Sequence, residues 1–495
     1  MIATELALLV WLVAIGLLVS VAYWPYGPLG LAFVSPIVGS ALYALAGLVL
    51  FTVGRFSTIG SLALASVAAI VPFVSGAVRG ALPSRRVLLT STAYTAAWSL
   101  IVFVIAALGT FGRLSPDSID YLTIAGGLER FGAIPEFTPD QILKRQFVTP
   151  VLQSGGVVTG RGYFLSLITL IGMSGFGLML WLGARGLTTR SVRDQRIMLV
   201  VGVVGAFVLS TNRVLFHMFY INGHGVFASL LVLVVGLLWH ATVTGRWSVA
   251  VLAGIAAAAI VPLRAEGIIV VAFFLLPVLV SASTPVSTRW TLVLPTVVTA
   301  VVWNAVALPG VLPAGSIGVT SSPAVAIAVA LALVVVVASS QVPLFASLIR
   351  WAPLAGFGVL LLYTGARAVR GTTSLLTTLS ATGANIGAEG LWAAFWWIAP
   401  LAIVACIVVV AVPHQNRLLW GLAAYPVLLL AFTYLRGSPY RVGPGDSANR
   451  MLMHVVFVIG LYLILAIGQI AAELEDDSWS LRSLFEDLKE SLAVR

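Results

Sequence analysis

Runs of about 20 apolar residues recur along this 495-residue chain and constrain its fold more than any other feature. Hydrophobic residues make up 60% of the sequence and charged residues only 9%, a balance typical of membrane proteins. Because backbone groups in hydrocarbon must bond within their own segment, such spans form helices. The sequence therefore predicts an all-α, polytopic transmembrane bundle of about 13–15 helices. The runs fall at 4–22, 31–53, 59–78, 88–109, 163–183, 197–211, 223–241, 248–263, 267–282, 290–308, 324–342, 352–366, 391–412, 417–435 and 451–472.

Composition divides the chain into three parts. We expect N-terminal transmembrane helices over 1–87, a larger transmembrane domain over 88–472 and a tail over 473–495. The larger domain contains a polar segment, 110–162, which predicts an interfacial, partly helical loop. The tail alternates apolar and charged residues, which suits a short amphipathic helix on the membrane surface or a solubilising tail.

Charge and cysteine content exclude several functions. The net charge is +10, and without a soluble basic domain it indicates membrane topology and anionic lipids rather than nucleic-acid binding. Cys406 is the only cysteine, so an intrachain disulfide and a cysteine metal cluster are both excluded. The first apolar run lacks a basic flank before it, and we expect a retained helix rather than a signal peptide.

Two short basic loops, near 79–86 and 185–196, predict the sidedness of a plasma-membrane protein, because such loops favour the cytoplasmic side. The segment 110–162 between them is then extracytoplasmic. Helix alternation places further segments on the same outer side: 212–222, 264–266, 309–323, 367–390 and 436–450. The basic residues divide almost evenly between the two sides. Either the predicted number of helices is wrong at some point, or the outer arginines bind an anionic ligand.

Asp117 and Asp120 are the first carboxylates on a segment that cannot lie within the bilayer. Pro116 suits the first turn of a helix, and carboxylates suit its positive end. On that helix Asp117, Asp120 and Tyr121 share one face. The pair could serve as a general base or ligate a divalent cation, or could simply cap an interfacial helix.

Lys144 and Arg145 follow a second helix start within the same polar segment. At a membrane surface such a pair can bind a lipid phosphate. The alternative is ordinary snorkelling of long basic side chains into the headgroup layer.

A polar turn lies between two apolar runs at 212–225. Its spacing makes a poor zinc site, because it has no HExxH pattern and no nearby carboxylate. It suits a sugar or phosphate site, or a turn whose side chains satisfy one another. The candidate ligands are Arg213, His217, Tyr220, Asn222 and His224.

Two further segments place charge at outer helix ends. Arg264 and Glu266 lie between two short runs, where they can pair with each other or face a ligand. Asp446 or Ser447 is a candidate N-cap, which puts Arg450 in the first helical turn, against the helix dipole. A bound phosphate at that helix end would explain the position of Arg450. Arg441 precedes this helix on the same side.

Taken in order, these segments resemble the GT-C superfamily of polytopic membrane glycosyltransferases, over about residues 90 to 470. The acidic motif Asp117 to Tyr121 is similar to the AspXaaXaaXaaTyr pattern of polyprenol-phosphate-mannose-dependent bacterial members. The AsnGlyHisGly turn at 222–225, ArgAlaGluGly at 264–267 and AsnArgMetLeuMetHis at 449–454 resemble later elements of the family. The chain differs in having three extra helices before the acidic loop and no large C-terminal soluble domain.

The resemblance implies an inverting transfer of sugar from a polyprenyl-phosphate donor to an extracytoplasmic glycan or glycolipid acceptor. Asp117 would be the base and Asp120 would orient the acceptor. A divalent cation is compatible with the family, and no other cofactor is implied. The residues implied to bind the donor phosphate are Lys144, Arg264, Arg441 and Arg450.

A transporter or flippase for a lipid-linked or anionic substrate is the main alternative, because broken helices and charges between them suit it. It also predicts an internal repeat, which the sequence does not show. A non-catalytic partner in an envelope assembly is the second alternative. Convergence of Asp117, His224, Arg264 and Arg450 on one outward-facing cavity would favour the enzyme.

Overall fold

The computed structural model describes residues 2–74, 84–108, 116–134, 142, 145–188, 194–311, 323–409, 413–435, 440–443 and 445–473. Within these ranges the chain is helical and contains no strand, which confirms the predicted all-α class. The α-helices are α1 (Ile2–Tyr23), α2 (Pro28–Thr52), α3 (Thr58–Val74), α4 (Arg85–Leu108), α5 (Pro116–Phe131), α7 (Val148–Val158), α8 (Leu165–Thr188), α9 (Asp194–Leu209), α10 (Asn212–Met218), α11 (Gly223–Thr244), α12 (Ala250–Ile260), α13 (Gly267–Leu279), α14 (Val286–Val301), α15 (Pro323–Ser339), α16 (Pro343–Ile349), α17 (Ala352–Arg370), α18 (Thr372–Ala384), α19 (Phe395–Val409), α20 (Pro413–Leu435), α21 (Ser447–Met451) and α22 (Val456–Glu473).

Helix length and composition support a polytopic membrane protein. Over the described ranges, nine helices are long and apolar enough to cross a membrane. Helices α9 and α10 together make a tenth candidate, bent by 83° at the break between them. Six shorter apolar helices of 10–17 residues complete the set. The chain is therefore a multi-pass helix bundle, as the apolar runs predict.

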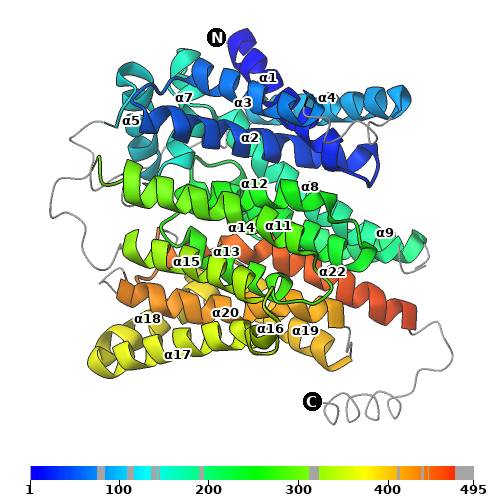
Figure 1. The fold of residues 1–495 in the computed structure, drawn as a ribbon, viewed down its shortest axis with the longest axis vertical. Coiled ribbons are helices and arrows are strands. Elements are labelled where there is room, and N and C mark those ends of the chain that lie inside the picture. The colour runs from blue at the N-terminus through cyan, green and yellow to red at the C-terminus, as the bar shows by residue number, and fades with distance from the viewer. Residues whose placement is uncertain are drawn as a thin grey trace.

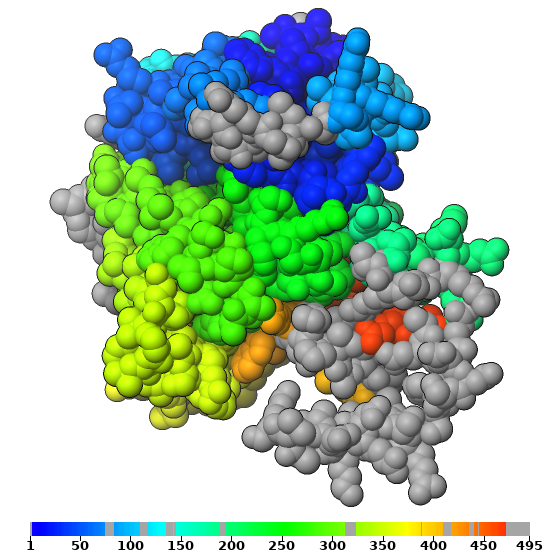
Figure 2. All heavy atoms as spheres, turned by 45° about the vertical axis from the view of Figure 1, so that its right-hand side comes forward, coloured from blue at the N-terminus to red at the C-terminus, as the bar shows by residue number. Residues whose placement is uncertain are grey.

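Most helices follow one another along the length of the molecule, but the last helix, α22, returns to the middle and packs against α8 and α9 (Figure 1). Helices α1 to α5 and α7 lie at one end. The middle contains α8, α11, α12 and α14, and α17 to α20 lie at the other end. Helix α2 packs against α1, α4 and α8, while α20 packs against α13 and α17. The space-filling view repeats this succession of blue, green and yellow segments (Figure 2).

Helices α1 and α2 approach each other through glycines. A Cβ added at Gly16 would lie 1.8 Å from the Ser35 carbonyl oxygen, and one at Gly39 would lie 2.2 Å from that of Leu12. Small residues permit such contact between membrane helices, where van der Waals packing drives association. These two glycines therefore determine how closely the first two helices pack.

Polar contacts gather several loops at one end of the bundle. Glu5, near the start of α1, pairs with Arg161 at 2.7 Å. Thr58 at the start of α3 donates its backbone N–H to Glu129 of α5 at 2.9 Å. The Phe147 N–H donates to the Pro262 carbonyl at 2.8 Å, which joins the segment before α7 to the end of α12. These contacts join the predicted outer segment 110–162 to α1, to α3 and to the break between α12 and α13.

The predicted break between two short helices is present. Helix α12 tightens into a 3-10 turn, η2 (Val261–Leu263), and α13 begins at Gly267. Gly267 is required here, because an added Cβ would lie 2.2 Å from the Ile260 carbonyl oxygen. The break holds Arg264 and Glu266 between two apolar helices.

Candidate functional site

Arg145 joins the two carboxylates of α5. Its Nη2 pairs with Asp117, and its Nε donates to Asp120 Oδ2 at 3.0 Å. Its guanidinium also lies over the Tyr121 ring, 5.5 Å from the ring centre. The predicted common face of Asp117, Asp120 and Tyr121 is thus confirmed, and Arg145 occupies it.

Arg450 holds the second oxygen of Asp117. Its Nη1 pairs with Asp117 Oδ2, so each oxygen of this carboxylate contacts a guanidinium group. Arg450 lies in α21, whose N-cap is Asp446 as predicted, with Asp446 Oδ2 accepting from the Ala448 N–H at 2.8 Å. The structure therefore places the carboxylate of Asp117 against Arg450 of α21.

Arg264 and Glu266 pair across the break after α12. The Nε of Arg264 donates to Glu266 Oε1 at 3.0 Å, and the two side chains are only 11% and 9% exposed. Burial acts to lower the pKa of Arg264, but the charge of Glu266 and a contact with Tyr121 outweigh it, and the pKa is raised. Arg264 therefore remains a cation although its side chain is largely buried.

The polar turn before α11 largely satisfies itself. Asn222 caps α11, with its Oδ1 accepting from the His224 N–H at 2.8 Å and lying 3.2 Å from His217 Nδ1. Its Nδ2 donates to the Tyr220 carbonyl at 3.0 Å. Burial raises the pKa of the Tyr220 phenol. A Cβ added at Gly223 would lie 3.8 Å from Arg264 Cδ, so this turn packs directly on the α12–α13 break.

Arg213 is buried at the start of α10. Its side chain is 1% exposed, and its guanidinium lies 5.5 Å from the centre of the Phe216 ring. Its backbone N–H donates to the Leu391 carbonyl at 3.2 Å. Its charge lies close enough to Tyr220 and Asp446 to interact with both.

A chain of buried hydrogen bonds fixes the orientation of His224. Tyr425 donates its one hydroxyl proton to the Met451 carbonyl at 2.6 Å, so it accepts from His454 Nδ1 at 2.9 Å. His454 is fully buried and forms no ion pair among the described residues, and such an environment favours neutral imidazole. Its Nε2 then accepts from His224 Nδ1 at 2.9 Å. Neutral His224 is left with the lone pair on Nε2.

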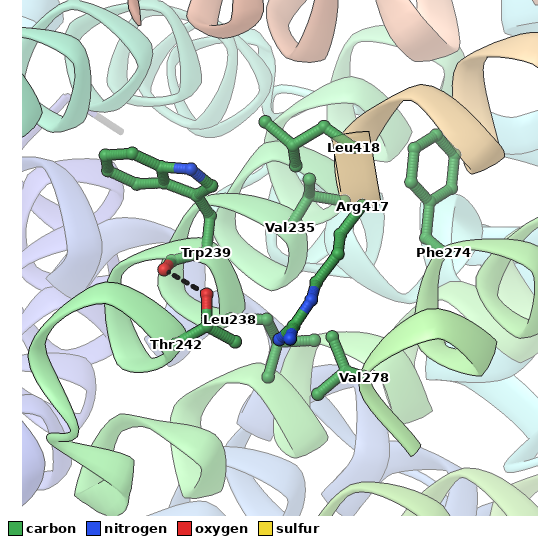
Figure 3. A pocket seen from close by; sticks show the side chains of 8 residues that line it. All are labelled: Val235, Leu238, Trp239, Thr242, Phe274, Val278, Arg417 and Leu418. Atoms are coloured by element: carbon green, nitrogen blue, oxygen red, sulfur yellow. Dashed lines mark hydrogen bonds between the residues drawn. The ribbon is translucent and has the colours of Figure 1, made fainter. Parts of the chain in front are cut away.

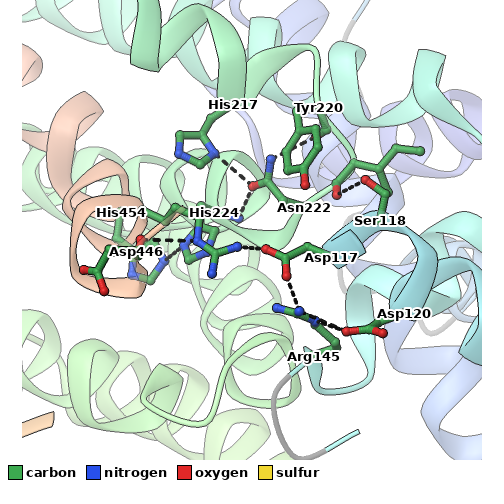
Figure 4. Close-up of polar contacts among 12 residues, drawn as sticks. Asp117, Ser118, Asp120, Arg145, His217, Tyr220, Asn222, His224, Asp446 and His454 are labelled. Atoms are coloured by element: carbon green, nitrogen blue, oxygen red, sulfur yellow. Dashed lines mark hydrogen bonds and ion pairs between the residues drawn. The ribbon is translucent and has the colours of Figure 1, made fainter. Parts of the chain in front are cut away.

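Residues from five segments that are distant in the sequence thus meet where α5, α11, α13 and α21 begin. Figure 4 shows Arg145 between Asp117 and Asp120, and His217, Asn222, His224 and His454 beside them. Ser118 and the Ile221 carbonyl, 3.4 Å apart, join α5 to the turn before α11. We call the set the polar cluster: Asp117, Asp120, Tyr121, Arg145, Asn222, His224, Arg264, Glu266, Arg450 and His454.

Six predicted ligands are not members of this cluster. Arg213, His217 and Tyr220 belong to the adjoining segment before α11, and Asp446 caps α21. The other two are Arg441 and Lys144. The Arg441 side chain is exposed, and only its backbone is seen to bond, through its N–H to Asp446 Oδ1 at 2.9 Å and its carbonyl to Asn385. Lys144 lies outside the described residues.

His454 and Tyr425 are members of the site that the sequence did not single out as ligands. His454 follows Arg450 by four positions, a spacing that puts both on one helix face and could have indicated its role. Tyr425 lies in the middle of an apolar run and offers no such signal.

The carboxylates are poorly arranged for a metal ion. Asp117 and Asp120 both form ion pairs with Arg145. A divalent ion would need the carboxylate oxygens that Arg145 contacts. Among the described residues, no group of three His, Cys, Asp or Glu side chains could hold a metal. We therefore derive no step through a metal.

No protein-family model, characterised protein or solved structure matches this chain. The resemblance to the GT-C superfamily rests on the motifs alone and stays a prediction.

Proposed function

We propose that the chain is an inverting glycosyltransferase that moves a sugar from a polyprenyl-phosphate donor to a hydroxyl of an extracytoplasmic glycan or glycolipid. The observation that carries this proposal is Asp117, held between Arg145 and Arg450 at one end of an apolar helix bundle. A carboxylate base and paired guanidinium groups are what this reaction requires.

The chemistry explains why the cluster is rich in cations. A sugar on a lipid phosphate carries a good leaving group, so a strong general acid is unnecessary. Preorganised cations stabilise the charge that develops on the departing phosphate. Arg145, Arg264 and Arg450 have side chains that are 11–13% exposed, so their charges act with little screening by water.

In the proposed step, the donor phosphate replaces Asp117 as the partner of Arg450 and Arg145. The released Asp117 carboxylate takes the proton of the acceptor hydroxyl while the acceptor oxygen attacks the anomeric carbon. The bond from that carbon to the phosphate oxygen breaks, and the polyprenyl phosphate leaves with the electron pair. Attack opposite the leaving group inverts the anomeric carbon, and Asp120 orients the acceptor or Arg145.

His224 supplies a different contact from the arginines. Its Nε2 lone pair accepts a hydrogen bond but repels anionic oxygen. We therefore expect His224 to accept a hydrogen bond from a sugar hydroxyl, while the guanidinium groups bind the phosphate. His454 and Tyr425 act through His224, as positioning residues that hold its tautomer.

The test is transfer by the purified protein in lipid nanodiscs, with polyprenyl-phosphate-linked sugars as donors and a lipid-linked glycan as acceptor. We expect a product with inverted anomeric configuration and the release of polyprenyl phosphate, with and without a chelator. Movement of the donor across a vesicle bilayer with no cleavage would contradict the proposal and identify a flippase instead.

A further inference from the structure

A small pocket, open on one side, lies between α11, α13 and α20. Figure 3 shows Arg417 reaching into it, among apolar side chains of the three helices. The lining residues are Val235, Leu238, Trp239, Thr242, Phe274, Val278, Arg417 and Leu418. Arg417 is the one charged residue of this lining.

The pocket lies at the opposite end of the bundle from the polar cluster. Helix α11 begins at Gly223, next to Asn222 and His224 of the cluster, and the nearest lining residue on it, Val235, is about 18 Å further along at 1.5 Å per residue. Helix α13 begins beside Arg264 and reaches the pocket with Phe274 and Val278. Helices α11 and α13 thus each contact the proposed site of transfer near one end and line this pocket further along.

The guanidinium group of Arg417 is set up to receive an anion. Its Nη1 is buried and has no hydrogen-bond partner among the described residues. Arg417 also lies one turn into α20, which begins at Pro413, and this helix end favours anions over cations. A cation held in an apolar pocket without a counterion is costly, so a bound anion would stabilise it.

We propose that this pocket binds the phosphate of an anionic phospholipid, with Arg417 as its phosphate ligand. The Thr242 hydroxyl donates to the Trp239 carbonyl at 2.7 Å, so the proton of Thr242 is already used. Leu238, Phe274 and Val278 present an apolar surface that suits an acyl chain rather than a soluble ion. The ligand is therefore amphiphilic, with a phosphate at Arg417 and its chains along α13.

The test measures the melting temperature of the detergent-purified protein with added phosphatidylglycerol, with phosphatidylcholine, and with inorganic phosphate. We expect phosphatidylglycerol to raise the wild-type melting temperature by about 2 °C or more over phosphatidylcholine, because a ligand that binds only the folded state stabilises it. Arg417→Gln should lose this shift, and Arg417→Lys should keep part of it. Arg350→Gln, which changes an exposed arginine, is the matched control and should keep all of it.

Val278→Phe provides a second variant that keeps the charge and narrows the pocket, and it should also lose the shift. If Arg417→Gln does not fold, this variant and Arg417→Lys still decide the outcome. An equal shift in wild type, Val278→Phe and Arg417→Gln would overturn the proposal. An Arg417-dependent shift with inorganic phosphate alone would overturn the lipid assignment and indicate a soluble anion.

Discussion

Asp117 in the first turn of α5 forms an ion pair with Arg450 in α21, near the other end of the chain. Arg145 holds the other oxygen of the same carboxylate. The Asp117–Arg450 pair brings together the proposed base, Asp117, and a proposed phosphate ligand, Arg450. Without substrate, Asp117 occupies the position at Arg450 that the donor phosphate would take in the proposed step.

The Asp117–Arg450 pair should be energetically coupled. The side chains are 24% and 13% exposed, so Asp117→Asn and Arg450→Gln should each lower the free energy of unfolding by about 1–3 kcal/mol. The double variant should lose less than the sum of the two. A denaturation series on the four proteins measures this coupling. Glu129→Gln with Arg450→Gln is the control and should be additive within about 0.5 kcal/mol, because Glu129 bonds Thr58 instead.

The tautomer of His224 should depend on Tyr425. We expect nitrogen-15 spectra of histidine-labelled wild type to show His224 and His454 protonated on Nδ1. Tyr425→Phe removes the acceptor for His454 Nδ1, so both rings should shift toward protonation on Nε2. Tyr462→Phe, at another buried tyrosine of the bundle, should leave the spectrum unchanged. A wild-type His224 protonated on Nε2 would contradict the proposed role as an acceptor.

The contact between α1 and α2 should not tolerate a methyl group. Gly16→Ala places a Cβ against the Ser35 carbonyl, and we expect a loss of about 1–3 kcal/mol in the free energy of unfolding. Gly202→Ala in α9 meets no atom within 4 Å and should be neutral or stabilising by about 0.5–1 kcal/mol. Equal stability of the two variants would show that the close approach of α1 and α2 does not contribute.

Local chemistry explains what the sequence predicted well. The helical spacing of Asp117, Asp120 and Tyr121 predicts their common face, and the AspSerAlaAsnArg pattern predicts the Asp446 cap. Charge between two short apolar runs predicts the break at Arg264. In each case the signal lies within about one helical turn.

Contacts between residues far apart in the chain could not be predicted from the sequence. Nothing local indicates that Arg145 contacts both carboxylates of α5 or that Arg450 contacts Asp117, because these pairs depend on how α5, α11 and α21 pack. The contact of His224 with His454 depends on the same packing. The predicted phosphate ligand Arg441 illustrates the converse, since it lies on the expected segment but its side chain is exposed.

The most direct test compares sugar transfer and donor binding by wild type, Asp117→Asn and Asp120→Asn in the same nanodiscs. We predict that Asp117→Asn still binds the polyprenyl-phosphate donor, because Arg145 and Arg450 no longer face the Asp117 carboxylate, but transfers sugar about 10²–10⁴-fold more slowly. Asp120→Asn should lose less activity. Transfer by Asp117→Asn within about twofold of the wild-type rate would contradict the assignment of Asp117 as the base.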